Sequence, residues 1–348
     1  MSDSAAARRP TMADVAREAG VSLSTVDRVL NLRAGVRADT AHRIANAAAK
    51  LGFHAHSVIE QRLRHEKPTI RLGFLLQKSG VAFYQGLAQA LADAAAATTR
   101  ARVRVMIGYL DDLDPLVVAR RIEAQRGEVD ALGVVAVDHV AVREAVSELR
   151  LNGMPVLAML SELATRAGAG YLGVDNRRMG RVAGWFVTRL APQPGPVAVM
   201  VGSQRFQCQE LCELSFRSYL AEAAGDWELL ASRLTLEDPG YARDNTLDLL
   251  SAYPNLAGLY VAGGGIEGVI QALQERQRQG LHLPTVVCHD LTAVTRDALK
   301  TGLVQAVLSH PREPLARHAV DALVTASLDN EQPGYELLPL QLDVPECH

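Results

Sequence analysis

The hydrophobic positions near the start of the chain fall at the spacing of three short helices. Apolar residues recur three and four positions apart in 12–19, 23–31 and 38–51, which predicts one helix in each segment. Gly20 is suited to end the first helix, because glycine tolerates a positive φ. Ser22 is suited to cap the second, because its hydroxyl accepts from a free backbone N–H. Two helices joined by so tight a turn, with a third behind them, are typical of a helix-turn-helix.

From residue 69 onward, short apolar runs alternate with amphipathic segments. This alternation predicts strands and helices that follow one another, and therefore parallel sheets with helices on both faces. About 270 residues with about ten strands favour two lobes over one sheet. The expected strands are 70–76, 103–108, 131–137, 155–160, 196–201, 228–235, 257–262, 284–288 and 304–308. The expected helices are 82–98, 115–126, 139–152, 177–190, 208–224, 241–253, 266–279, 292–301 and 313–328.

The composition predicts a folded chain with no transmembrane helix. Hydrophobic residues make up 48% and charged residues 22% of the 348 residues, which excludes a mostly disordered or collagen-like chain. No apolar run reaches the about 18 residues of a transmembrane helix, and the first residues lack the apolar stretch of a secretory signal. We therefore expect a cytoplasmic protein. Four unevenly spaced cysteines predict no disulfide framework.

The net charge of -3 is unevenly distributed. Residues 1–67 hold 11 lysines and arginines against 7 aspartates and glutamates, whereas the remainder is acidic. A small basic unit before a larger acidic body favours a polyanion-binding module with a separate body, although chance surface charge would give the same numbers.

The second predicted helix carries side chains suited to DNA. Ser24 and Arg28 lie four positions apart on one exposed face, where both reach base edges in a major groove. Short hydrogen-bond donors at helix ends suit phosphate oxygens. The alternative is a small helical bundle in which these residues only cap helices. The short donors are Thr11, Ser22, Thr25 and Asn31.

The segments TMADVAREAGVSLSTVDRVLN and VRADTAHRIANAAAKLGF resemble the DNA-binding headpiece of the lactose/galactose repressor (LacI/GalR) family, over residues 11–56. In that family the second helix lies in the operator's major groove, and its first two residues and a later arginine read bases. By this resemblance the base-reading residues are Leu23, Ser24 and Arg28. Asp27 departs from the family, where a small serine is usual; beside Arg28 this acid either orients the arginine or repels phosphate.

The resemblance implies a hinge helix in 57–68 with a leucine that enters the minor groove. Such a wedge unstacks a base step and kinks the duplex. Counted without gaps, Arg62 occupies the wedge position and Leu63 follows it. Either Leu63 is the wedge in a shifted register, or Arg62 reads a narrow minor groove electrostatically. An ordinary charged linker is the alternative, and Glu60 adds a charge where a small residue is common.

Residues 69–345 resemble the periplasmic sugar-binding-protein fold that LacI/GalR members carry behind the headpiece. The resemblance implies three crossings between lobes, near 174, 290 and 318. A small ligand then binds between the lobes, where the strand ends of both meet. The implied N-lobe is 69–173 plus 291–318, and the implied C-lobe is 175–289 plus 320–345. The clearest signatures are FYQGLAQAL (83–91), YLGVDNRRMGRVA (171–183) and VVCHDLTAVTRDALKTGLVQAVLSHP (286–311).

Acids and aromatics at the predicted strand ends supply the candidate effector contacts. The family counterpart of Asp290 accepts hydrogen bonds from sugar hydroxyls, and the pair Asp175-Asn176 contacts the ligand or the interlobe hinge. Carboxylates suit rows of O–H donors and favour a sugar-like or polyol-like ligand, although each acid alone is equally suited to a cap or turn. The full set is Phe83, Tyr84, Asp138, Asp175, Asn176, Asp290 and His310.

Within the sensor, three positions depart from the common pattern of the family. Relatives often place an arginine and a glycine where this chain has Cys212 and Ser215, and a glutamine where it has His310. Losing the arginine removes a fixed fork of donors to sugar or carboxylate oxygens. Either the effector differs from the common ones or the cleft is altered, with Arg205 and Arg217 as the residues that would compensate.

Two further patterns have competing interpretations. Gly263–Gly268 satisfies G-x-G-x-x-G, a formal dinucleotide fingerprint, but it lies late in the chain and matches a glycine-rich turn of the binding-protein fold. Cys208 and Cys212 would hold a metal together with His289 or His310, but isolated cysteines are more often buried apolar fillers. We expect neither a cofactor nor a metal.

The sequence therefore predicts an α/β protein with an all-α helix-turn-helix headpiece (11–56) after a flexible start (1–10), a hinge (57–68) and a two-lobed sensor of doubly wound parallel sheets. We expect a transcription repressor and not an enzyme. It would bind double-stranded operator DNA as a homodimer or tetramer, respond to a sugar-like effector and have no membrane partner. The alternative is an NAD(P)-linked enzyme that uses the glycine-rich loop at 263–268.

Overall fold

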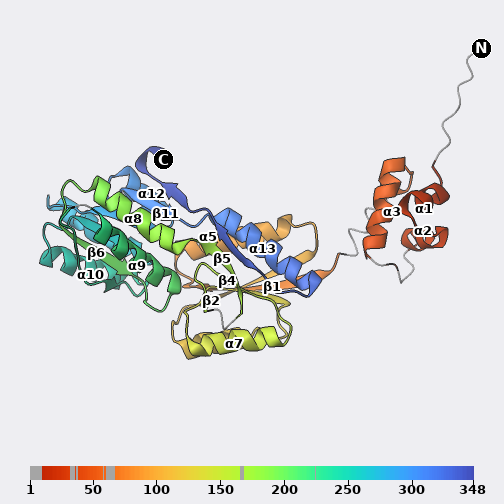
Figure 1. The fold of residues 1–348 in the computed structure, drawn as a ribbon, viewed down its shortest axis with the longest axis horizontal. Coiled ribbons are helices and arrows are strands. Elements are labelled where there is room, and N and C mark those ends of the chain that lie inside the picture. The colour runs from red at the N-terminus through yellow and green to blue at the C-terminus, as the bar shows by residue number, and fades with distance from the viewer. Residues whose placement is uncertain are drawn as a thin grey trace, which may run out of the picture. The chain divides into compact units, whose positions relative to one another are not determined.

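The computed structural model describes residues 10–31, 36, 38–57, 59, 67–164, 168–223 and 225–348 (Figure 1). These residues fall into two compact units. One unit holds the chain up to Thr69 with Arg100–Arg102, and the other holds Ile70–Thr99 and Val103–His348. Residues 1–9 of the start expected to be flexible (1–10) and most of the expected hinge (57–68) lie outside the described residues. Among those that are described, no helix is long and apolar enough to span a bilayer.

The first unit is a bundle of three helices: α1 (Met12–Ala19), α2 (Leu23–Leu30) and α3 (Ala38–Leu51). Gly20 ends α1 in the left-handed region at φ 64°, as expected of a glycine after a helix. Val15, Val26 and Ile44 are fully buried between the three helices. One apolar stripe per helix thus forms the core and leaves the outer face of α2 exposed.

The second unit contains two sheets, and its first lobe is built on six strands in the order β12-β5-β4-β3-β1-β2. The helices α5 and α13 pack against each other, as do α6 and α7, and Figure 1 shows α7 and α13 on opposite sides of this sheet. The strands are β1 (Thr69–Gln77), β2 (Arg102–Leu110), β3 (Ala131–Val134), β4 (Val156–Met159), β5 (Gly170–Val174) and β12 (Tyr335–Leu338). The helices are α5 (Ala82–Ala97), α6 (Pro115–Glu123), α7 (Val140–Leu151) and α13 (Arg312–Asp329).

The second lobe is built on a sheet in the order β13-β11-β10-β9-β6-β7, with β8 also paired to β6. Its strands run parallel except for β13, which is antiparallel to β11. The strands are β6 (Pro196–Val201), β7 (Glu228–Leu229), β8 (Arg233–Leu234), β9 (Gly258–Val261), β10 (Thr285–His289), β11 (Ala306–Ser309) and β13 (Gln341–Asp343). The helices are α8 (Asn176–Leu190), α9 (Gln207–Glu222), α10 (Pro239–Ala252), α11 (Ile266–Arg278) and α12 (Ala293–Lys300).

The sheet pairings correct two of the three predicted crossings between lobes. β10 and β11 pair directly, with Val287 opposite Ala306, so 291–309 belongs to the second lobe and not the first. A strand–helix–strand unit with adjacent parallel strands keeps its crossover on one sheet. The second crossing therefore follows β11 instead of residue 290. The third lies between β12, which pairs with β5, and β13, instead of near 318.

The strand expected over 228–235 is also corrected. It forms two separate pieces, β7 and β8, which pair with different parts of β6. Leu230 turns inward between them and is buried. The strand pairing with β6 is therefore interrupted between the two pieces.

Candidate functional site

The N-terminus of α2 is fixed by its own side chains. The Ser22 hydroxyl accepts from the Thr25 N–H at 3.2 Å and lies 2.7 Å from the Thr25 hydroxyl and 2.9 Å from that of Ser24. At α1, Thr11 and Asp14 form a reciprocal capping box. The Ser22 hydrogen bonds set the orientation of the first turn of α2, the helix that the sequence predicts to enter the major groove.

The outer face of α2 presents the predicted base-reading residues together. Leu23 is 50% exposed, and Ser24 and Arg28 are also exposed. Asp27 accepts a hydrogen bond from the Asn31 amide at 2.7 Å. Asn31, predicted as a phosphate contact, thus also holds this acid. The predicted wedge residues, Arg62 and Leu63, lie outside the described residues.

A cavity lies between the two lobes of the second unit, at the carboxyl ends of strands from both sheets. The space among its lining atoms is about 690 Å³ when the part open to solvent is included, and the space that the centre of a water molecule can reach is about 80 Å³. Of the predicted effector residues, Phe83, Tyr84, Asp290 and His310 line it. The other lining residues are Val81, Val135, Leu160, Ser161, Phe206, Cys208, Gln209, Glu237, Ala262, Gly263, Gly264, Ile266, Glu267, His289 and Thr292.

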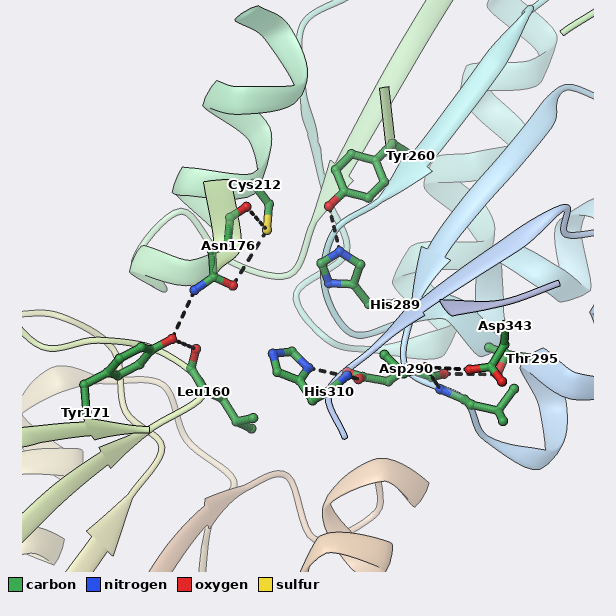
Figure 2. A network of polar contacts seen from close by, with 12 residues as sticks. Leu160, Tyr171, Asn176, Cys212, Tyr260, His289, Asp290, Thr295, His310 and Asp343 are labelled. Atoms are coloured by element: carbon green, nitrogen blue, oxygen red, sulfur yellow. Dashed lines mark hydrogen bonds and ion pairs between the residues drawn. The ribbon is translucent and has the colours of Figure 1, made fainter. Parts of the chain in front are cut away.

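Asp290 and His310 form the best-defined polar pair of this cavity (Figure 2). Oδ1 of Asp290 accepts from the backbone N–H of His310 at 2.9 Å and lies 2.9 Å from its Nδ1. Asp290 itself has a left-handed backbone, at φ 60°, and its carbonyl accepts from the Thr295 hydroxyl at 3.0 Å. Burial raises the pKa of the Asp290 carboxyl, but the charge and hydrogen bonds of His310 outweigh it, so the pKa is lowered overall.

The aromatic side of the cavity comes from the first lobe. Phe83 and Tyr84 lie in the first turn of α5, and their ring centroids are 5.2 Å apart. The Phe83 ring is 6.0 Å from the ring of His310. Burial raises the pKa of the Tyr84 hydroxyl well above its usual value, so it stays neutral. Apolar ring surface from one lobe thus lies close to the polar pair of the other.

His289 lines the cavity although it was not predicted as an effector residue. Its Nε2 lies 2.6 Å from the hydroxyl of Tyr260 (Figure 2), and the Tyr260 ring stacks on that of Phe216. Burial lowers the pKa of His289 to about 4, so the ring is neutral near pH 7. Its position at the end of β10, directly before Asp290, is the signal that could have identified it.

Three predicted effector residues lie outside the cavity lining. The Asp138 carboxylate pairs with Arg143 Nε at 3.1 Å, and that of Asp175 caps α8 by accepting from the Arg178 N–H at 3.0 Å. Asn176 is at the first crossing between the lobes.

At the first crossing between the lobes, Asn176 connects side chains of both lobes (Figure 2). Its side-chain amide donates to the Tyr171 hydroxyl of the first lobe at 3.2 Å. Its backbone carbonyl accepts from the Cys212 thiol of the second lobe at 3.3 Å. Of the two roles that the resemblance allowed for this residue, its contacts here are those of the hinge. Arg205 and Arg217 are not among the lining residues.

The two lobes touch through the segment between β6 and α9. Phe206 is 2% exposed and belongs to a hydrophobic cluster made otherwise of first-lobe residues. The Asp138 N–H donates to the Arg205 carbonyl at 2.9 Å, and the Cys208 N–H to the Ser161 hydroxyl at 3.4 Å. The lobes are therefore closed upon the cavity.

The glycine-rich loop and the cysteine pair have packing roles. A side chain at Gly263 would meet the Gln209 amide oxygen, and one at Gly268 would clash with the backbone of Pro239. Burial raises the pKa of the Cys208 thiol to about 12 and raises that of Cys212 as well, so both stay protonated. Within the described residues, no group of three or more His, Cys, Asp or Glu could hold a metal ion.

Each of the two units matches a known protein family. Residues 11–56 match the model for bacterial regulatory proteins of the lacI family, and residues 72–331 match that for a periplasmic binding protein domain. The ribose operon repressor of Bacillus subtilis is 25% identical over 315 residues, covering 87% of this chain and 86% of that protein. Catabolite control protein A of Priestia megaterium is 27% identical over 151 residues, 43% of each chain.

A solved structure has the same fold as the second unit. The solute-binding protein of an ABC transporter from Burkholderia graminis, in complex with D-arabinose, superposes with a TM-score of 0.74. It is 20% identical, and the match covers 81% of this chain and 97% of that one.

A helix-turn-helix followed by a two-lobed binding-protein fold defines the class of ligand-responsive DNA-binding regulators. The chain carries a DNA-binding domain of the lacI family of bacterial regulatory proteins at residues 11–56 and belongs, over residues 72–331, to the periplasmic binding protein domain family. The predicted family and α/β fold class are confirmed.

Proposed function

We propose that this chain is a cytoplasmic transcription repressor that binds operator DNA as a homodimer and is controlled by a sugar-like or polyol-like effector in the interlobe cavity. The observation that carries the proposal is the cavity, with ring surface from Phe83 and Tyr84 on one side and the Asp290–His310 pair on the other. Ring faces suit the C–H surface of a sugar, and a carboxylate suits its hydroxyls.

The names and ligands of similar proteins support the same function. A ribose operon repressor and catabolite control protein A match in sequence, and a solute-binding protein with bound D-arabinose shares the fold. The exposed base-reading set on α2 supplies the DNA contact: Leu23, Ser24 and Arg28.

The mechanism requires no chemical step. An effector that touches both lobes binds the closed arrangement better than an open one and shifts the population toward it. Closure moves the lobes relative to each other, and in a dimer this changes the spacing of the two headpieces. Effector binding and operator binding are then coupled, and each changes the affinity of the other by the same factor.

The test begins with selection of duplex sites from random-sequence DNA by the full chain. We expect a site with two related half-sites, because a symmetric dimer binds a symmetric operator. Fluorescence anisotropy then measures the affinity for this site with and without sugars and polyols at millimolar concentration. We expect at least one of them to change the affinity about tenfold or more, as typical coupling energies allow.

A duplex with scrambled half-sites is the control, and its weak binding should not respond to any sugar. Selection without an enriched sequence would overturn the DNA-binding part of the proposal. Saturable binding of NAD(P)H in place of any sugar would instead favour the enzyme alternative at 263–268.

A further inference from the structure

A buried acid and an amide form a second polar pair in the interlobe cavity. Glu237 lies on the loop between β8 and α10 and is only 5% exposed, and Gln209 in α9 is 6% exposed. The Gln209 amide donates to Glu237 Oε1 at 3.0 Å. Its oxygen accepts from the backbone N–H groups of Gly202, at 2.7 Å, and Ser203, at 3.0 Å. Two N–H donors on the oxygen fix which way the amide points, so its NH₂ must face Glu237.

The surrounding backbone is shaped around this pair. Leu236 and Glu237 are both left-handed, at φ 54° and 51°, a conformation that costs energy for residues with side chains and persists only where the surroundings impose it. Glycines leave the space that the pair fills. A Cβ would lie 2.6 Å from Glu237 Cγ at Gly202, 2.7 Å from Gln209 Oε1 at Gly263, and 3.1 Å from Glu237 Cδ at Gly264.

The second carboxylate oxygen of Glu237 is left without a partner. Oε2 is buried and accepts no hydrogen bond from the described residues. Burial raises the pKa of the carboxyl, against smaller opposing effects of Gln209, the Gly264 N–H and Lys78. A buried carboxylate is costly unless it is paired with a charge or fully hydrogen-bonded. The Gln209 amide and the Gly264 N–H are both neutral, and Oε2 has no hydrogen-bond partner among the described residues.

The charges around the cavity point to the missing partner. Three acids line it, Glu237, Glu267 and Asp290, and none of the described lining residues is lysine or arginine. His289 is neutral. His310 turns Nδ1 toward Asp290 and leaves its buried Nε2 without a partner. The unpartnered Glu237 Oε2 therefore calls for a hydrogen-bond donor, and the acids of the lining favour one that is a cation.

We propose that Glu237, oriented by Gln209, is an effector-binding residue of the second lobe that selects a protonated amine, so that the effector is an amino sugar or amino polyol. An ammonium group donates to Oε2 and also offsets the buried negative charge, whereas a hydroxyl only donates. Sugar acids and sugar phosphates bring further negative charge to a cavity that three acids already line, and are repelled. The inference rests on the proposed function, because it assumes that the effector binds in this cavity.

Calorimetry on the full chain at pH 7 tests the inference with matched pairs of compounds. The pairs are D-glucosamine and D-glucose, D-galactosamine and D-galactose, D-mannosamine and D-mannose, and glucamine and sorbitol. In at least one pair we expect the amine to bind tenfold or more tightly than its neutral partner. The N-acetyl form of that amine, gluconate and glucose 6-phosphate should bind no better than the neutral partner.

Two variants assign the preference to one acid. Glu237→Gln keeps the shape and removes the charge, and it should reduce the preference for the amine to about twofold or less. Glu267→Gln removes an equal charge from the same cavity and should retain the preference, because its carboxylate is not the one held by Gln209. The reverse result would overturn the assignment to Glu237. The wild-type comparison stands on its own should Glu237→Gln fail to fold.

The remaining outcomes separate this inference from the proposed function. Equal binding of amine and neutral partners, or no binding by any amine, overturns the amine-selective site. A neutral sugar that then changes operator affinity still supports the effector-controlled repressor. An amine that binds tightly through Glu237 but leaves operator affinity unchanged supports the site and overturns the proposed regulation.

Discussion

His310 directs its backbone N–H and its ring Nδ1 at the same oxygen of Asp290, each at 2.9 Å. Asp290 follows β10, and His310 follows β11 at the point where the chain leaves the second lobe for α13. The Asp290 carboxylate therefore borders the cavity and at the same time holds the start of a crossing between lobes. An effector that bonds to Asp290 acts directly on a segment that must turn when the lobes move.

Asp290→Asn should weaken effector binding and leave the unliganded protein almost unchanged on DNA. The asparagine amide keeps the shape of the aspartate side chain but lacks its negative charge. That charge strengthens the hydrogen bonds that effector hydroxyls or amines donate to Asp290. The expected loss is about 1.5–3 kcal/mol. Calorimetry with a bound compound from the sugar panel gives the affinity, and anisotropy gives the operator affinity without effector.

Asp138→Asn is the matched control for this change. Asp138 also follows a strand of the sensor, but its carboxylate pairs with Arg143 and is not part of the lining. Its effector affinity should stay within about twofold of wild type. Equal losses in the two variants, or none in Asp290→Asn, would place the effector elsewhere.

Phe206→Ala should open the lobes and weaken effector binding. Phe206 extends from the second lobe into a cluster of first-lobe side chains, so its ring stabilises the closed arrangement only. Truncating a buried phenylalanine costs about 3–5 kcal/mol, and here the cost falls on closure. Small-angle scattering should show a larger radius of gyration without effector, and calorimetry an affinity tenfold or more below wild type. An unchanged radius together with an unchanged affinity would show that Phe206 does not hold the lobes together.

Local patterns predicted the elements of this chain better than their pairing. The predicted helix bounds in the headpiece agree with α1 and α3 to the residue, because one apolar stripe defines each helix. The prediction that placed β11 in the first lobe was wrong, because strand pairing joins residues that are far apart in the sequence. No local pattern near Ala306 reports that it lies opposite Val287.

In the candidate site too, residues after clearly patterned strands were predicted, whereas a residue after a short, unrecognised strand was not. Asp290 and Phe83 were placed near a cleft because they follow strands, and both line the cavity. Glu237 was missed because the strand before it, β8, has only two residues and was merged into a longer predicted run. The rule that ligands bind at the carboxyl ends of strands would have found Glu237 once β8 was recognised.

His289 should make the second lobe less stable as the pH falls below about 6.5. Its pKa is about 4 in the folded protein and about 6.5 when unfolded. The unfolded chain therefore takes up the proton first, and the lost stability grows as pH falls from 6.5 to 4. At pH 5 the loss is about 2 kcal/mol. Urea unfolding at pH 7.5 and pH 5, compared between wild type and His289→Gln, should show that difference.

Tryptophan fluorescence reports the unfolding of the second lobe in this measurement. The chain has two tryptophans, Trp185 in α8 and Trp227 before β7, and both belong to the lobe that contains His289. Tyr260→Phe is the control, because the histidine stays buried and its contribution to the pH dependence should remain. A His289→Gln variant with the full wild-type pH dependence would refute the assignment to His289.

The hinge prediction depends on the choice between two neighbouring residues. If Leu63 is the minor-groove wedge, Leu63→Ala should weaken operator binding and reduce DNA bending without changing effector affinity, because the wedge unstacks a base step. Bending is measured by energy transfer between dyes at the two ends of the operator. A loss of bending in Arg62→Ala and not in Leu63→Ala would show that the register is not shifted.

Arg28→Ala should relax the sequence preference of the protein at one base position. Arg28 and Ser24 are exposed on α2, where an arginine reads a guanine edge through two hydrogen bonds. The expected cost is about 1–3 kcal/mol on the selected operator, and less on random duplex. Arg43→Ala is the matched control, because it removes the same charge from an exposed position on α3 and should leave the base preference intact. Anisotropy on operators with each base changed in turn makes the comparison. Equal weakening of Arg28→Ala on selected and random duplex would show that Arg28 contacts only phosphate.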